Sequence, residues 1–433
     1  MKLSKHKLGE LIEVTRGASL SGQFYAEKGE LIRLTLGNFN MNGGGFKENT
    51  SKTNLYYTGT VKDEFILNKG DIITPLTEQS LGLLGTTARI PESGKYIQSQ
   101  DVALVKCKEG LLDPNFCYYL ISSSVVRQQL SAGAQQTKIR HTSPDKIKDC
   151  TAWVPELEVQ KRIGRILYDI DEKIALNRQI NDNLEAIAKQ LYDYWFVQFD
   201  FPNEEDKPYK SSGGAMVWNE KLKREIPEGW EVKQLRDIIE TNRGISYNTS
   251  SISGGGVPMI NLASFNVDGS YKDTGLKSYN GNYTQEKILR PFDLVLCNTQ
   301  QTAIEFSKDI IGKAFLIPDI FDGDIVSSHH INTIKTEEVL KPYLAYLSNT
   351  YHFHKYATGC CSGTNILGLD YNSFSQYKLE IPPKYLLKEF RDFIIDIGKR
   401  KSLIIKENKL LTKQRNELLP LLMNGQASVN YHL

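Results

Sequence analysis

Two polar loops carry the side chains that are best suited to chemistry. The first spans 131–141 and contains Gln135, Gln136, Lys138, Arg140 and His141, and the second contains Asn298, Gln300 and Gln301 directly after an apolar run. Amides and arginine form paired hydrogen bonds with base edges in double-stranded DNA. The alternative is an ordinary solvated turn, although binding residues favour loops held on rigid scaffolds. We therefore take these eight residues as candidate base contacts.

A long helix is the element that would hold such loops in place. Residues 165–201 contain neither glycine nor proline. A 3-4-spaced apolar stripe runs along this stretch and predicts the seam of a coiled coil: Ile163, Ile166, Ile170, Ile180, Leu184, Ile187, Leu191 and Tyr194. Asn177 interrupts the stripe, and a buried asparagine in such a seam commonly fixes its register. A helix of roughly 40 residues is about 60 Å long and needs a partner helix.

The partner helix belongs to an internal duplication. A shift of 227 residues superimposes Ile163 on Phe390 and Leu191 on Leu418, and the same shift superimposes Arg16-Gly17 on Arg243-Gly244. One offset that holds at both ends of a segment predicts a tandem repeat, in which each copy is a globular part followed by a long helix. Short β-branched runs between Gly, Asn and Ser turns predict that each globular part is a mixed, mostly β domain.

The repeat gives an order of domains and extends the set of candidate residues. We expect a globular domain over 1–154, a long helix over 155–200, a connector over 201–229, a second globular domain over 230–382, a second long helix over 383–425 and a tail over 426–433. The polar loop 358–365 corresponds to the loop 131–141, so Thr364 and Asn365 join the candidate DNA contacts, together with Arg243. The interior loops differ between the copies, which indicates one scaffold with two different reading surfaces.

Composition excludes several classes of protein. No apolar run approaches the 18 residues of a membrane span, and the N-terminus lacks the apolar core of a signal peptide. Six scattered cysteines without a Cys-x-x-Cys pair indicate reduced thiols in the cytoplasm. Residues 1–155 hold 19 Lys and Arg against 15 Asp and Glu, and residues 230–383 hold 13 against 16. The net charges of +4 and −3 do not by themselves favour a DNA-binding protein.

Catalytic, cofactor and metal motifs all fail on closer reading, so we expect none of these sites in this chain. Residues 113–116, Asp-Pro-Asn-Phe, look like a degenerate catalytic loop of amino-methyltransferases, but the repeat places Lys-Pro-Tyr at 341–343. The shared proline predicts a first helical turn with Asp113 as its N-cap. A phosphate-binding loop is absent from the sequence, and the histidine pairs and Cys360-Cys361 lack the spacing of metal ligands.

An aromatic run closes the first long helix. It contains Tyr192, Tyr194, Trp195, Phe196 and Phe199. One interpretation is a hydrophobic cap packed on the globular domains. The other is a docking surface for a partner chain, because exposed aromatic patches mark interfaces. Both interpretations can hold for different members of the run.

Three stretches of the chain resemble the specificity subunit of type I restriction–modification enzymes. QLYDYWFVQFDFP at 190–202 is similar to the central conserved segment of that family, EGWEVKQL at 228–235 to the entry into its second half, and RNELLPLLMNG at 415–425 to its distal conserved end. The resemblance covers essentially the whole chain. It implies an α+β fold of two mixed, mostly β target recognition domains in tandem, joined by two long antiparallel helices of coiled-coil type.

The resemblance also implies a function. Each target recognition domain would read one half of a split, asymmetric DNA site, and the helices would set the distance between the halves and dock two methyltransferase subunits. Those subunits would bind S-adenosylmethionine and methylate adenine, and restriction subunits would add ATP- and Mg-dependent translocation and cleavage. This chain itself would catalyse nothing. Two alternatives are a recognition subunit of another modification or phage-defence system, and a two-armed scaffold without a DNA role.

Overall fold

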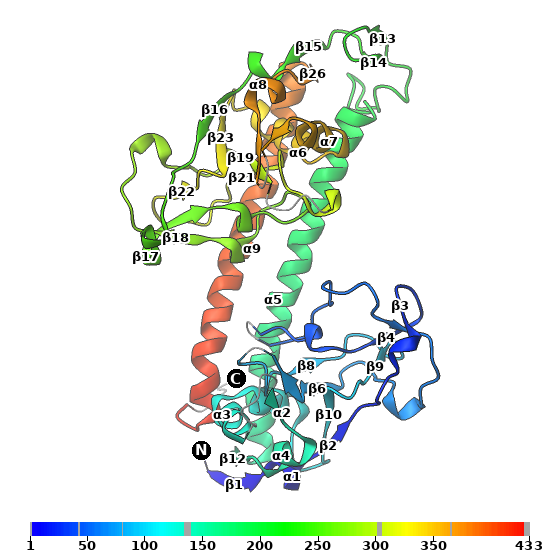
Figure 1. The fold of residues 1–433 in the computed structure, drawn as a ribbon, viewed down its shortest axis with the longest axis vertical. Helices are drawn as coiled ribbons and strands as arrows, with labels where there is room; N and C mark the ends of the chain where they lie inside the picture. The colour runs from blue at the N-terminus through cyan, green and yellow to red at the C-terminus, as the bar shows by residue number, and fades with distance from the viewer. Residues whose placement is uncertain are drawn as a thin grey trace. The chain divides into compact units, whose positions relative to one another are not determined.

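The computed structural model describes residues 2–41, 44–79, 81–133, 140–300, 305–363 and 366–427, with the side chains of Ser253 and Gln300 left out. The chain forms two compact units (Figure 1). Unit 1 contains residues 1–176 and 408–433, and unit 2 contains residues 177–407. Each unit therefore combines one globular domain with a segment of each long helix.

An antiparallel four-stranded sheet organises unit 1. Its strand order is β2 (Ile12–Arg16), β10 (Val102–Cys107), β6 (Ile72–Pro75) and β8 (Ala88–Arg89). The central strand β10 is buried from Val102 to Val105, as a continuous apolar run predicts for a strand covered on both faces. Three smaller sheets surround it: β1 (Leu3–Lys7) with β12 (Thr151–Pro155), β7 (Thr77–Glu78) with β11 (Arg140–His141), and β3 (Tyr25–Ala26), β5 (Tyr56–Tyr57), β4 (Leu31–Arg33) and β9 (Tyr96–Ile97).

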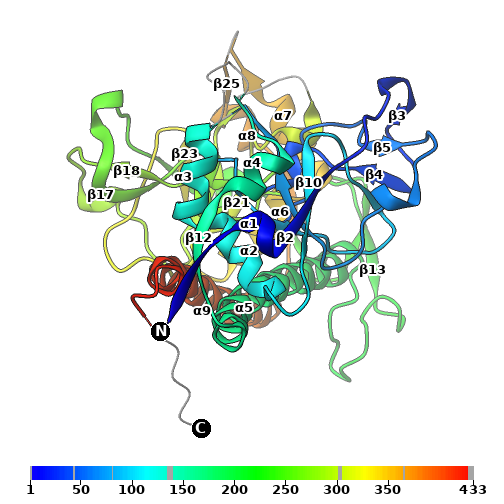
Figure 2. The same cartoon turned by 90° about the horizontal axis from the view of Figure 1, so that it is seen from below.

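Short helices attach this domain to the first long helix. They are α1 (Leu8–Leu11), α2 (Pro114–Ser122), α3 (Ser124–Gly133) and α4 (Pro144–Asp149). Asp113 caps α2, since its Oδ1 accepts a hydrogen bond from the Phe116 amide at 2.9 Å. Leu8, Phe116, Ile147 and Ile163 are fully buried in one core, which fixes α1, α2 and α4 against the long helix (Figure 2).

Unit 2 repeats this architecture. Its main sheet has the order β16 (Glu240–Arg243), β23 (Ile331–Lys335), β19 (Leu294–Cys297) and β21 (Ala314–Leu316). The smaller sheets are β15 (Glu231–Gln234) with β26 (Lys378–Ile381); β20 (Thr299–Gln300), β25 (Leu367–Leu369) and β24 (Cys361–Ser362); and β18 (Lys277–Tyr279), β17 (Ile252–Ile260) and β22 (Val326–Ser327). The helices are α6 (Leu340–Ser348), α7 (Tyr351–Gly359) and α8 (Tyr371–Phe374), and β13 (Met216–Asn219) pairs with β14 (Arg224–Pro227) in a hairpin.

The two main sheets share one register. Val14 of β2 lies opposite Val105 of β10, and Thr241 of β16 lies opposite Ile334 of β23. The offset is 227 residues in the first strand of each pair and 229 in the second. The predicted fold, two mixed, mostly β domains in tandem with two long helices, is confirmed.

The long helices are α5 (Leu157–Tyr192), which continues as a π-helical turn over Asp193–Val197, and α9 (Lys384–Met423). The stripe predicted for α5 is partly wrong, because Ile180 and Ile187 are 37% and 47% exposed. Leu167, Ile174 and Ala188 are buried instead. The buried residues keep the 3-4 spacing, but the phase of the seam differs from that of the apolar stripe by one residue in this half of the helix.

Polar contacts join the two long helices in an antiparallel arrangement within each unit. In unit 1, Arg415 of α9 pairs with Asp171 of α5 at 2.7 Å. In unit 2, the Asn177 Nδ2 donates to Glu407 Oε2 at 2.7 Å, and Lys401 pairs with Glu185. Each step forward along α5 meets a step backward along α9. Asn177 is 1% exposed, so the predicted buried asparagine of the seam is present.

Candidate nucleic-acid interface

In unit 1, the candidate loop begins where the main sheet passes into the ribbon of β7 and β11. Arg140 lies opposite Glu78 in this ribbon, and its Nη1 pairs with Glu78 Oε1 at 2.9 Å. Glu78 is 2% exposed, and its Oε2 accepts hydrogen bonds from the amides of Gly82, Leu83 and Leu84 at 2.9–3.1 Å. The Arg140 side chain also donates to the Ser131 carbonyl. Arg140 thus holds the loop together, and its guanidinium has little capacity left for a base.

His141 has a different environment from its neighbour. It is exposed and opposite Thr77, so its ring is accessible beside the ribbon. Gln135, Gln136 and Lys138 lie outside the described residues. Their role as base contacts stays a prediction.

In unit 2, the corresponding ribbon is β20 with β25. Asn298 precedes it and is only 8% exposed. Its Nδ2 donates to the His329 carbonyl at 3.1 Å and to Asn332 Oδ1 at 2.7 Å, while its Oδ1 accepts from the Thr299 hydroxyl at 2.7 Å. An amide with all its groups engaged inside the protein supports a loop and does not read a base.

The remaining candidates of unit 2 have no described side-chain geometry. Gln300 lies on β20 opposite Leu367. Gln301, Thr364 and Asn365 lie outside the described residues. Their predicted role as DNA contacts is carried by their position beside the ribbon and by their chemistry.

A basic cluster at the same end of the sheet in unit 2 escaped the sequence reading. Lys277 Nζ donates to the Tyr247 hydroxyl at 2.7 Å, and Lys287 Nζ donates to the Arg243 carbonyl at 2.7 Å. Burial lowers the pKa of His330 to about 4, and His329, Arg243 and Lys277 lower it further. Burial and the same two cations also lower the pKa of His329. These shifts report a local positive potential in a domain whose net charge is negative.

The aromatic run at the end of α5 packs mostly as core. Tyr192, Trp195, Phe196 and Phe199 are each at most 6% exposed. Phe196 meets Phe390 edge-on, with ring centroids 4.9 Å apart. Burial leaves these four side chains no surface for a partner chain, which corrects that part of the docking prediction. Tyr194 is 38% exposed, so its docking role stays a prediction.

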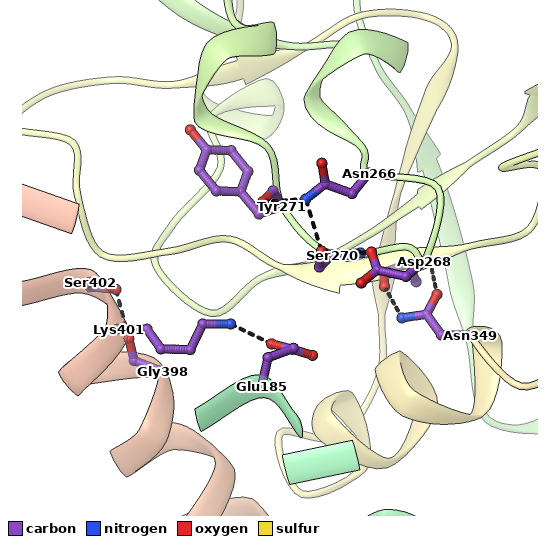
Figure 3. A network of polar contacts seen from close by, with 10 residues as sticks. Glu185, Asn266, Asp268, Ser270, Tyr271, Asn349, Gly398, Lys401 and Ser402 are labelled. Carbon is purple, nitrogen blue, oxygen red and sulfur yellow. Dashed lines mark hydrogen bonds and ion pairs between the residues drawn. The ribbon is translucent and has the colours of Figure 1, made fainter. Parts of the chain in front are cut away.

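Neither metal ligands nor a catalytic cluster emerge among the residues that the structure describes. His, Cys, Asp and Glu side chains do not gather there in groups of three or more that could hold a metal ion. The described helices also include none that is long and apolar enough to cross a membrane. A cavity of about 120 Å³ borders α6 and α9 in unit 2, beside the Lys401–Glu185 pair and Ser402 (Figure 3). Phe292, Phe315 and Ile394 contribute to its largely apolar lining, which is typical of imperfect packing.

Comparison with known proteins explains the repeated scaffold. The family described as the type I restriction modification DNA specificity domain matches residues 2–186 and again residues 227–412. The chain belongs to this family. It is therefore the specificity subunit of a type I restriction–modification system, a DNA-recognition component and not the catalytic one. The two matches correspond to the two copies that the shift of 227 residues predicts.

Named relatives agree with this assignment. The type I restriction enzyme MjaIX specificity subunit of Methanocaldococcus jannaschii is 22% identical over 325 residues, which cover 74% of this chain and 71% of the relative. The HindI specificity subunit of Haemophilus influenzae is 22% identical over 385 residues, which cover 76% and 81%. A crystal structure of the S subunit of a type I restriction–modification system from M. genitalium superimposes with a TM-score of 0.59 at 14% identity, and it covers 98% of this chain and 96% of that one.

Proposed function

We propose that the two globular domains read different halves of one bipartite, asymmetric DNA site. The observation that carries this proposal is a shared sheet register that leads into two different ribbons. In unit 1 the ribbon is held by the ion pair of Arg140 and Glu78. In unit 2 the amide of Asn298 takes over that task. One scaffold with two chemically different reading edges is what an asymmetric site requires.

The long helices supply the second part of the proposal. Ile180, Ile187, Tyr194 and Val197 are all exposed on α5, within unit 2. The first three follow a heptad spacing, so they form one apolar stripe outside the buried seam. We assign this stripe to the docking of a methyltransferase subunit, with a second such subunit in the complete complex. The partners would bind S-adenosylmethionine, and restriction subunits would supply ATP- and Mg-dependent translocation and cleavage.

The test is a map of methylated adenines in cells with and without this gene. Deletion should remove methylation at one bipartite motif. Replacing residues 1–150 by the corresponding domain of another specificity subunit should then change one half of the motif and leave the other half unchanged. A change in both halves would contradict independent reading, and an unaltered methylation map after deletion would contradict the function itself.

A further inference from the structure

The first arginine of interest ends strand β2 in unit 1. Arg16 lies opposite Ala103 of β10, and Gly17 follows it. A Cβ atom at Gly17 would overlap the carbonyl oxygens of Gln98 and Ser99. The next residue, Ala18, donates its amide to the Gln98 carbonyl at 2.9 Å. Only glycine permits this close passage of the two backbones.

Unit 2 contains the same arrangement at the end of β16. Arg243 lies opposite Asn332 of β23, and Gly244 would bring a Cβ atom onto the carbonyl oxygens of Ser327 and Ser328. Ile245 then donates its amide to the Ser327 carbonyl at 2.7 Å. Both copies also form a parallel bridge at this point, Ala18 with Ser99 and Ile245 with Ser328. The backbone therefore delivers an arginine to the same place in both domains.

Both arginine side chains are exposed there. Arg16 has neither a hydrogen bond nor an ion pair within the described part of the chain. Arg243 uses only its Nε, which donates to the His329 carbonyl at 2.9 Å, so its terminal nitrogens stay available. Two exposed cations without carboxylate partners are suited to bind an anion.

The position of the two arginines relative to the reading ribbons is equivalent. Ala103 lies between Arg16 and Thr74 of β6, and Asn332 lies between Arg243 and Leu296 of β19. From these rows β6 and β19 run on into β7 and β20, the strands of the two ribbons. Each arginine is thus placed at the end of its main sheet from which the candidate reading loops emerge.

We propose that Arg16 and Arg243 bind equivalent backbone phosphates, one in each half-site, and set the position of each domain on DNA. This inference rests on the proposed function. The ribbons differ between the copies, as two different half-sites demand, whereas the arginine, the glycine and their register are the same. A contact shared by readers of different sequences cannot encode the difference between them. Phosphate contacts fix register and carry no sequence information, which suits a shared side chain.

The experiment uses the full chain in complex with its methyltransferase subunit and a duplex that carries the mapped motif. Affinity is measured as a function of salt concentration for the wild type, Arg16→Gln, Arg243→Gln and the double variant. Each single change should weaken binding roughly tenfold and reduce the slope of log affinity against log salt by about 1, the double change by about 2. The loss should be equal for the motif and for duplexes with altered bases, and the methylated motif should stay the same.

Two controls separate a contact from a folding defect. Arg16→Lys keeps the charge and should keep the wild-type salt slope. Arg236→Gln removes another exposed arginine of unit 2, whose counterpart in the first copy is Gly9, and it should leave the slope unchanged. An unchanged slope in Arg16→Gln or Arg243→Gln would overturn the proposal, as would relaxed base preference at one position of the motif. Failure of the wild-type complex to prefer its motif would instead overturn the proposed function.

Discussion

Asp171 of α5 accepts a hydrogen bond from Arg415 of α9 and, through its other oxygen, from the Tyr119 hydroxyl of α2, both at 2.7 Å. One carboxylate therefore ties both long helices to the first recognition domain. The Arg415 side chain is 11% exposed and that of Asp171 is 27% exposed. Burial and the Asp171 charge raise the pKa of Tyr119, so its hydroxyl stays a donor at any ordinary pH.

Replacing Arg415 by methionine should destabilise unit 1 by about 2 kcal/mol. A fully buried pair that loses one partner costs about 3–5 kcal/mol, and partial solvation of Asp171 reduces that cost. Adding Asp171→Asn should recover part of the loss, because the amide oxygen still accepts from Tyr119 without a lone charge. Urea unfolding of the two single variants and the double variant measures this coupling. Additive effects of the two substitutions would show that the pair contributes nothing specific.

The two close backbone passages predict matched effects of alanine substitution. Gly17→Ala and Gly244→Ala should each cost about 2–3 kcal/mol, since the added methyl group would overlap carbonyl oxygens that belong to the main sheet. Gly22→Ala and Gly323→Ala serve as controls, because a Cβ atom at either position meets only ordinary contacts or open space. Thermal unfolding of the four variants decides the point. Equal melting temperatures for Gly17→Ala and Gly22→Ala would contradict the geometry.

Trp195 and Tyr194 should separate folding from assembly. Trp195 is 6% exposed and Tyr194 is 38% exposed. Trp195→Ala should cost about 3–5 kcal/mol in unfolding experiments, because it leaves a large cavity in the core of unit 2. Tyr194→Ala should change stability by less than about 1 kcal/mol and should weaken co-purification with the methyltransferase subunit. Wild-type assembly by both Tyr194→Ala and Ile187→Ala would remove the exposed stripe from consideration as the docking surface.

Local patterns in the sequence were sufficient for the repeat, the long helices and the Asp113 cap, because each depends on residues close together in the chain. The phase of the coiled-coil seam was not. Ile180 is exposed while Asn177 is buried, since the packed residues Leu167 and Ile174 determine which side of the helix faces inward. An apolar residue beside the seam looks the same in sequence as one inside it.

The candidate interface depended on contacts between distant residues. Asn298 has the chemistry of a base reader, but the carbonyl of His329, 31 residues away, engages its amide. The basic cluster joins Arg243, Lys277 and Lys287, which come from three segments of a domain with a net charge of −3. A domain's net charge cannot reveal such clustering. The shared Arg16-Gly17 and Arg243-Gly244 pairs were visible in the repeat, and their exposed position required the structure.

His330 should make unit 2 less stable in mild acid. Its pKa falls from 6.5 to about 4 in the folded chain, first through burial and then through His329 and Arg243. The unfolded chain takes up the proton first as pH falls below about 6.5, so the stabilisation present above that pH is lost progressively down to about pH 4. Urea unfolding midpoints at pH 7 and pH 5 measure the loss. His330→Gln should show a smaller difference between the two midpoints than the wild type, and an equal difference would exclude His330 as the source.

The length of the helix pair should set the gap between the two half-sites. Four residues inserted after Glu185 add about 6 Å at 1.5 Å per residue, and a base-pair step is about 3.4 Å, so the gap should grow by one or two base pairs with both half-sites unchanged. Four residues nearly restore the helix face, whereas one residue turns it by about 100°. Because Glu185 pairs with Lys401 and Asn177 with Glu407, an insertion in α5 alone disturbs one of these contacts. A matched insertion between Lys401 and Glu407 in α9 should preserve both, and it should give the more stable complex with the same longer gap. Methylated-motif mapping reads the result, and an active double insertion that keeps the original gap would show that the connector, not the helix pair, positions the domains.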